Sequence, residues 1–125
     1  MVVHGLEGLD EISISGPSIV GELKDGQIRE YGMAPQDFGL QLHPLEAIRV
    51  EGIEQSKAMV LSALANDTGA ERDIVALNAG ASIYVAGLVP SIAEGIRKAQ
   101  AVIASGAARK KLDQFVAYTR SIDKQ

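Results

Sequence analysis

Two adjacent carboxylates, Asp10 and Glu11, are the residues of this sequence with the clearest chemical potential. They follow a short apolar run, and Gly5 and Gly8 indicate an irregular loop around them. On a regular strand neighbouring side chains point to opposite faces, whereas in a loop both carboxylates can converge on one cation. Mg²⁺ prefers oxygen ligands and keeps several waters, so one or two carboxylates beside a substrate phosphate suffice. Taken alone, the pair fits either a magnesium half-site or two solvated loop acids.

The other polar side chains give weaker signals. His4 stands at a strand end without a partner motif, which is more typical of a structural residue than of a general base or metal ligand. His43 lies in an irregular stretch, and the case for a functional role is weaker for it than for His4. Asn78 lies in an apolar helical segment, and because a buried amide must be hydrogen-bonded, we expect it to tie its helix to neighbouring backbone. Tyr84 and Tyr118 are expected to pack helices while keeping a polar tip.

Motifs that would indicate other chemistry are missing. The sequence contains no P-loop, dinucleotide fingerprint or serine nucleophile elbow, and no histidine pair with metal-ligand spacing. The absence of cysteine excludes disulfides, thiolate metal sites and cysteine nucleophiles. A phosphate-handling site needs a cradle of backbone N–H groups or basic side chains. The acid pair therefore has no visible phosphate-binding partner in this sequence.

Composition predicts one modest folded domain. Of 125 residues, 46% are hydrophobic and 22% charged, which is typical of a soluble domain. Aromatic residues make up only 4%, so the core must consist of Ala, Val, Ile and Leu with closely packed helices. A net charge of −4 argues against nucleic-acid binding, which needs a basic surface. No signal peptide or membrane-length apolar run is visible, and we expect a cytoplasmic protein with no membrane partner.

The elements that must position these residues fall into two parts. Residues 1–45 are expected to form strands and a hairpin, and residues 53–122 to form four helices. An apolar strand begins at residue 1 with no lead-in, which suggests a truncated domain. Residues 12–15 alternate apolar and polar, which predicts a half-buried strand. Asp25-Gly26 between two β-like runs predicts a hairpin, followed by a turn at 35–39 and one helical turn near 45–48.

The four helices are expected at 53–66, 71–86, from Pro90 to about 105, and 107–121. Gly69 and Gly106 should end the first and third. The second is apolar nearly all round and should be central and buried. The fourth should turn one side inward, namely Leu112, Phe115, Val116, Thr119 and Ile122. Close helix approach explains the glycines in or beside helices at positions 80, 87 and 95.

Five segments, in chain order, together resemble the anthranilate phosphoribosyltransferase family. VVHG and GLDEIS, at 2–5 and 8–13, resemble the segment around its acidic metal motif. PQDFGL at 35–40 resembles the turn after its hairpin, RDIVALNAGASIYVAG at 72–87 its long buried helix, and IASGAA at 103–108 its final helix corner. The similarity runs the full length of the chain. It implies an α+β fragment, the carboxy-terminal portion of an α/β phosphoribosyltransferase catalytic domain.

The resemblance also implies a function. In this family anthranilate attacks the anomeric carbon of phosphoribosyl pyrophosphate and pyrophosphate leaves, a step of tryptophan biosynthesis. It implies that Asp10 and Glu11 bind Mg²⁺, with Gly8 and Leu9 shaping the loop, and it leaves a homodimer open. The family's helical amino-terminal domain, Gly-Thr-Gly-Gly-Asp loop and Lys-His-Gly-Asn segment do not occur here. We therefore expect most of the substrate sites, and the missing amino-terminal part as partner, to lie outside this chain, which should be inactive alone.

Two other classes of function stay open at this stage. One is a free-standing structural or interaction module that self-associates through an exposed apolar sheet face. The other is a relative within the same superfamily, either a nucleoside phosphorylase or a nucleic-acid-binding protein. The acidic charge balance disfavours the nucleic-acid version.

Overall fold

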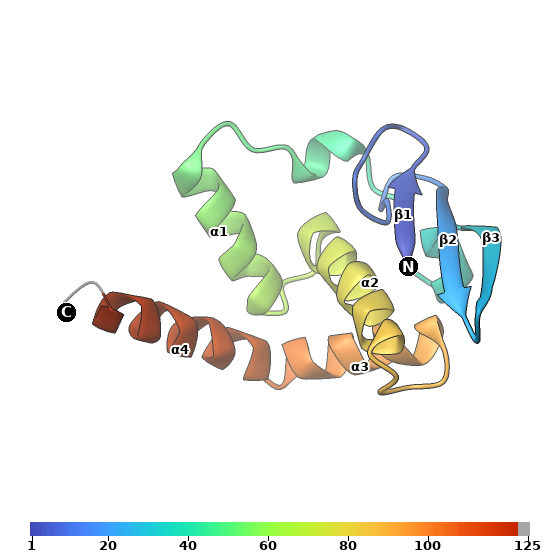
Figure 1. The fold of residues 1–125 in the computed structure, drawn as a ribbon. Helices are drawn as coiled ribbons and strands as arrows, with labels where there is room; N and C mark the ends of the chain where they lie inside the picture. The colour runs from blue at the N-terminus through green and yellow to red at the C-terminus, as the bar shows by residue number, and fades with distance from the viewer. Residues whose placement is uncertain (123–125) are drawn as a thin grey trace.

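The computed structural model describes residues 1–122, which form a small antiparallel sheet followed by helices (Figure 1). The strands are β1 Val2–Gly5, β2 Ser18–Lys24 and β3 Gln27–Met33. Two 3₁₀ turns, η1 Pro35–Phe38 and η2 Leu45–Ile48, lead to the helices α1 Ile53–Leu64, α2 Ala70–Val85, α3 Ile92–Ala104 and α4 Ala107–Ile122. The predicted order of strands, hairpin and four helices is confirmed. No helix among residues 1–122 has both the length and the apolar character needed to cross a bilayer.

The sheet has the strand order β1-β2-β3, and both pairings are antiparallel. The predicted hairpin turn is confirmed, because Asp25 and Gly26 have φ values of 51° and 75°. Positive φ at both turn positions matches the right-handed twist of the flanking strands, and aspartate and glycine tolerate it best. One sheet face packs on the helices, whereas the other leaves Val2 and Ile28 each 76% exposed.

Residues 12–15 are not a strand, and this prediction was wrong. Ile12, Ser13 and Ile14 are all buried, so the alternation of apolar and polar residues does not mark an inner and an outer face. No neighbouring strand binds this backbone; side chains supply most of its partners, and the His43 N–H donates to the Ile14 carbonyl at 3.1 Å. The Ser13 N–H donates to Ser18 Oγ at 2.8 Å, and Asn78 binds the backbone of Ile12. A segment whose backbone groups are satisfied by side chains needs no place in a sheet.

The helix limits differ from the predicted ones by one to two residues, mostly because of caps. α1 ends at Leu64, and Asn66 adopts a left-handed conformation with φ 67°. Gly69 is the N-cap of α2 rather than the end of α1. α3 begins at Ile92 instead of Pro90, because the Ser91 hydroxyl accepts a hydrogen bond from the Glu94 N–H and caps the helix.

α2 is the central helix, as predicted, and packs most closely on α3 (Figure 1). Leu77, Ala81 and Ile96 join Ile12, Ile14 and Val20 from the sheet side in one hydrophobic core. α2 is not buried all round, however, since Val75 is 38% and Val85 55% exposed. At the crossing of α2 and α3, Gly80 and Gly95 lie back to back, and close helix approach is confirmed for both. Gly87 instead ends α2 with φ 73°.

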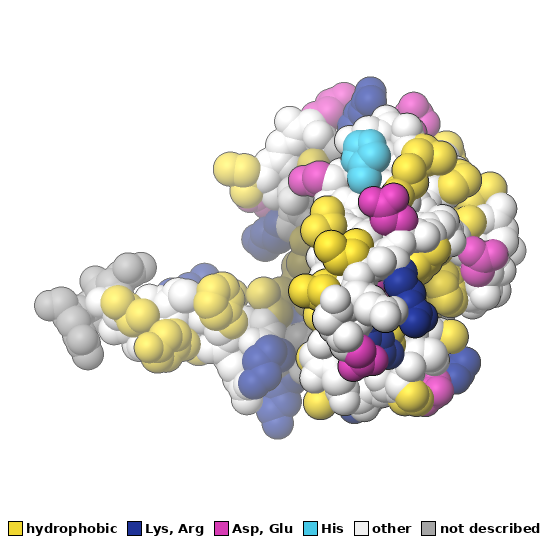
Figure 2. All heavy atoms as spheres, turned by 45° about the vertical axis from the view of Figure 1, so that its right-hand side comes forward, with side chains coloured by type: hydrophobic (Ala, Val, Ile, Leu, Met, Phe, Trp, Pro, Cys, Tyr) yellow, Lys and Arg dark blue, Asp and Glu magenta, His cyan; other side chains and the backbone are white. Residues whose placement is uncertain are grey.

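α4 has no buried residue, so its predicted inner side was wrong in part. Figure 2 shows the helix as an arm that projects from the body, with hydrophobic side chains on its surface. Phe115 is 62% and Ile122 52% exposed, whereas Leu112 and Val116 are half-buried in a groove beside α1. The amphipathic pattern predicted the helix correctly, but no element lies against most of its apolar side.

Candidate functional site

Asp10 and Glu11 lie in the loop that joins β1 to β2, and both are exposed. The loop turns tightly just before them. The Gly5 N–H donates to the Leu9 carbonyl at 2.9 Å, and the Gly8 N–H donates to the Gly5 carbonyl at 2.9 Å. Gly8 has φ 102°, a conformation that side chains disfavour, so glycine at this position shapes the turn. The acid pair therefore lies in a loop, as predicted, and hydrogen bonds order the turn that precedes it.

Packing closes the same turn at its base. A methyl group at Gly5 would lie 3.1 Å from Leu9 Cβ and 3.2 Å from Ser13 Cβ, which leaves little room for any side chain. The Leu6 N–H donates to the Pro17 carbonyl at 3.0 Å and joins the start of the loop to its end. These contacts fix the loop backbone that carries Asp10 and Glu11.

A carboxylate that sequence reasoning missed organises the interior of the loop. Glu7 accepts hydrogen bonds from the hydroxyls of Ser13 and Ser15, the latter at 2.9 Å. Burial raises the pKa of Glu7, but the hydrogen bonds from Ser13, from its own backbone and from Ser15, together with nearby His4, outweigh burial and hold that pKa below its usual range. The ionised Glu7 thus accepts hydrogen bonds that hold the loop together. The two serines at positions 13 and 15 were the feature of the sequence that could have indicated this role.

Asn78 supports the other end of the acid pair. Its Oδ1 accepts from the Ile12 N–H at 2.9 Å, and its Nδ2 donates to the Ile12 carbonyl at 2.9 Å and to the Ile74 carbonyl at 3.1 Å. The prediction that Asn78 ties its helix to neighbouring backbone is confirmed. Because Ile12 directly follows Glu11, this tie connects α2 to the acidic loop.

The acid pair borders a shallow hollow of about 250 Å³ between the loop, η2, α1 and α2. Leu9, Asp10 and Glu11 form one wall, and the opposite walls are formed by Ile48, Met59, Val60, Ala63, Glu71, Ile74 and Val75. Within residues 1–122 no group of three or more His, Cys, Asp or Glu side chains could hold a metal ion. Two hard oxygen donors at an open edge still fit Mg²⁺, which retains waters and phosphate oxygens as its other ligands.

The two histidines lie away from the acid pair's hollow. His4 is exposed on the sheet and pairs with Ile19 of β2. His43 Nε2 lies 3.4 Å from Oδ2 of the buried Asp73, whose Oδ1 accepts from Arg72 at 2.8 Å. Sequence reasoning missed this cluster. It joins the loop before η2 to the start of α2.

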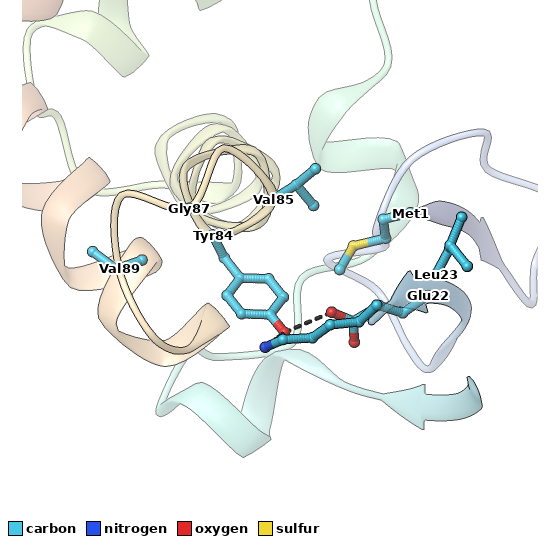
Figure 3. Close-up of a pocket in the computed structure, with 8 residues that line it drawn as sticks. Met1, Glu22, Leu23, Tyr84, Val85, Gly87 and Val89 are labelled. Atoms are coloured by element: carbon cyan, nitrogen blue, oxygen red, sulfur yellow. Dashed lines mark hydrogen bonds between the residues drawn. The ribbon is translucent and has the colours of Figure 1, made fainter. Parts of the chain in front are cut away.

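A second polar cluster joins the hairpin to α2 (Figure 3). The Tyr84 hydroxyl donates to Glu22 Oε1 at 2.5 Å, the Tyr31 hydroxyl donates to Glu22 Oε2 at 3.0 Å, and Lys24 Nζ donates to the Tyr84 oxygen at 3.0 Å. The hydrogen bond from Tyr84 is the largest cause that lowers the pKa of Glu22, with a further contribution from Tyr31. The polar tip predicted for Tyr84 therefore has a defined partner. Tyr118, by contrast, is 66% exposed, so its predicted packing role was wrong.

This cluster predicts an unusual tyrosine titration. Burial first, and then the hydrogen bond to Glu22, raise the pKa of Tyr31 from 10.0 to about 12. Since the folded value exceeds the unfolded one, the stability that Tyr31 contributes is complete below pH 10 and is lost as the pH rises towards 12. An ultraviolet phenolate titration should show a step near pH 12 that Tyr31→Phe removes. If the step persists in the variant, the assignment is wrong.

Comparison with known proteins places this architecture in a family. The family model described as "Glycosyl transferase family, a/b domain" matches residues 1–109. Two curated relatives are anthranilate phosphoribosyltransferases. That of Polynucleobacter asymbioticus is 57% identical over 121 residues, and that of Acidovorax sp. (strain JS42) is 52% identical over 122. These alignments cover 97% and 98% of this chain, but only 36% of each relative.

Solved structures agree with the sequence relatives. The anthranilate phosphoribosyltransferase of Thermus thermophilus superposes with a TM-score of 0.85 at 41% identity, over 95% of this chain and 35% of that one. The Saccharomyces cerevisiae enzyme in complex with PRPP and Mg superposes with a TM-score of 0.81 at 26% identity, over 95% and 34%. The resemblance indicated by the sequence motifs is confirmed. This chain belongs to the glycosyl transferase family with the a/b domain, and it spans about 36% of the length of the curated relatives it matches.

Proposed function

We propose that this chain contributes the magnesium-binding acid pair to an anthranilate phosphoribosyltransferase. The overall reaction would transfer the phosphoribosyl group from phosphoribosyl pyrophosphate to anthranilate, in tryptophan biosynthesis. The strongest support is the 57% identity to a curated enzyme of that name across 97% of this chain. A biosynthetic role of this kind would fit the cytoplasmic location expected from the sequence.

Asp10 and Glu11 would hold Mg²⁺ through their carboxylate oxygens. When bound, Mg²⁺ would neutralise negative charge on a pyrophosphate leaving group. The chain's own contribution is to present two carboxylates at an open edge, on a turn closed by Gly5 and Gly8 and supported by Asn78. An open edge leaves room for the diphosphate and for the waters that Mg²⁺ retains.

The chain by itself should bind the substrates poorly. A sugar pyrophosphate needs a cradle of backbone N–H groups or basic side chains, and the acid pair's hollow has no basic side chain in its lining. We therefore infer that the phosphate and anthranilate sites lie mostly in the roughly two thirds of the relatives' length that this chain does not span. The exposed apolar sheet face is compatible with the self-associating alternative, but no observation favours the nucleoside phosphorylase or nucleic-acid-binding alternatives.

A chimaera tests the proposal. The matching segment of the Polynucleobacter asymbioticus enzyme would be replaced by this chain, and phosphoribosylanthranilate formation would be measured by chromatography. We expect turnover in the chimaera and no product from this chain alone, because only the chimaera combines the acid pair with the remaining sites. A folded chimaera without activity, with the parent enzyme active in parallel, would contradict the proposed function.

A further inference from the structure

We propose that Asn78 is a positioning residue for the acid pair, so that it sets the affinity of the loop for a divalent cation. This inference rests on the proposed function, because it assumes that Asp10 and Glu11 bind the metal. Asn78 does not line the hollow that the acids border, and it would act only through the backbone at Ile12.

The orientation of the Asn78 amide follows from its partners. The Ile12 N–H can only donate, so it must face Oδ1, and the Ile12 and Ile74 carbonyls can only accept, so they must face Nδ2. The side chain thus offers Ile12 one acceptor and one donor, as a neighbouring strand would. This explains why the segment after the acid pair stays ordered without joining the sheet.

Because Ile12 is buried, its hydrogen bonds to Asn78 are difficult to replace. Ile12 is 1% exposed, so water cannot readily replace Asn78 as the partner of its N–H and carbonyl groups. Losing the amide would leave two buried backbone groups unpaired, which favours displacement of the loop towards solvent. Since Ile12 adjoins Glu11, such a displacement would move the carboxylates directly.

The acids have no other side-chain support. Among residues 1–122, neither the Asp10 nor the Glu11 carboxylate forms a hydrogen bond or ion pair with another side chain. Their positions are therefore set by the backbone, which Asn78 holds after the pair and the Gly5–Leu9 hydrogen bond holds before it. Removing a residue that orients metal ligands typically lowers metal affinity by roughly 10- to 100-fold.

The test uses Mn²⁺ as a paramagnetic probe on the 125-residue chain. Mn²⁺ broadens nearby NMR signals even when it binds weakly, so the Asp10 and Glu11 amide signals report binding at the proposed site. We compare the parent with Asn78→Leu, which removes both hydrogen-bonding groups, and Asn78→Asp, which keeps the acceptor for the Ile12 N–H. Ser82→Ala is the matched control, because Ser82 Oγ donates only to the Asn78 carbonyl, one turn along α2.

We expect Asn78→Leu to raise the Mn²⁺ concentration for half-maximal broadening by about tenfold or more. Asn78→Asp should cause a smaller shift, and Ser82→Ala none. Thermal unfolding of each variant identifies those that are folded at the assay temperature. If Asn78→Leu is not folded, Asn78→Asp is the variant whose Mn²⁺ midpoint is compared with that of the parent. A folded Asn78 variant with the parent's Mn²⁺ midpoint would overturn the inference, since a purely stabilising role would lower the melting temperature alone.

The same titration separates this inference from the proposed function. If the Asp10→Asn/Glu11→Gln double variant abolishes broadening while both folded Asn78 variants bind as the parent does, only the role of Asn78 fails. If the double variant binds Mn²⁺ at the same loop as well as the parent, the metal role of the acids fails, and the role of Asn78 fails with it.

Discussion

Converting Asp10 to Asn and Glu11 to Gln is expected to lower turnover of the active chimaera by roughly 10²- to 10³-fold at a fixed Mg²⁺ concentration. The amides keep the size and the backbone conformation of the acids but lose the negative charge that attracts Mg²⁺. Raising the Mg²⁺ concentration should recover part of the activity, because weaker binding can be offset by mass action. Initial rates measured across a magnesium titration would provide the check.

The matched control neutralises the same two residue types elsewhere. Asp25 lies in the hairpin turn, where Asn tolerates the positive φ, and the Glu54 side chain is 89% exposed on α1. Asp25→Asn/Glu54→Gln therefore changes the net charge equally without touching the loop, and it should leave the magnesium dependence unchanged. If the two double variants showed the same dependence, the acid pair would have no special role as a ligand.

Replacing Gly95 with Ala is expected to destabilise the chain by about 2 kcal/mol, even though Ala normally favours a helix over Gly by about 1 kcal/mol. A methyl group at position 95 would overlap the Gly80 carbonyl oxygen. A methyl group at position 80 would lie 2.5 Å from the Ile96 nitrogen, so neither helix can yield by a rotamer change. The helices would have to separate, and the core at Leu77 and Ile96 would lose packing. Urea unfolding measures the loss.

Gly16 provides the control for this substitution. A methyl group there would meet nothing within 4 Å, and its φ is not in the left-handed region. Gly16→Ala should therefore be neutral or slightly stabilising, because it lowers the entropy of the unfolded chain. Equal stability of Gly95→Ala and the parent would mean that α2 and α3 are further apart than this structure has them.

Local sequence determined the elements of this protein. The hairpin follows from Asp25-Gly26, because positive φ at two successive positions suits these residues. Apolar spacing located the four helices, and the glycines at 80 and 95 indicated their close approach. The position of Asp10 and Glu11 in a loop was also predicted from local signals, because the flanking glycines indicate a loop. The hairpin, the helices and the loop depend on interactions between residues near one another in the chain, and glycine was the local signal for the one contact between helices that was predicted.

Only the tertiary structure decided which residues those elements meet. Residues 12–15 have the alternation of a strand, yet the partner of the Ile12 backbone is the side chain of Asn78, 66 positions along the chain. α4 has the pattern of an inward-facing helix, yet most of its apolar side meets no other element. The spacing of apolar residues shows that one face of a helix is apolar, but it does not show which other element packs on that face. The partners of a buried backbone group or an apolar face are set by contacts between distant parts of the chain, and local patterns do not contain that information.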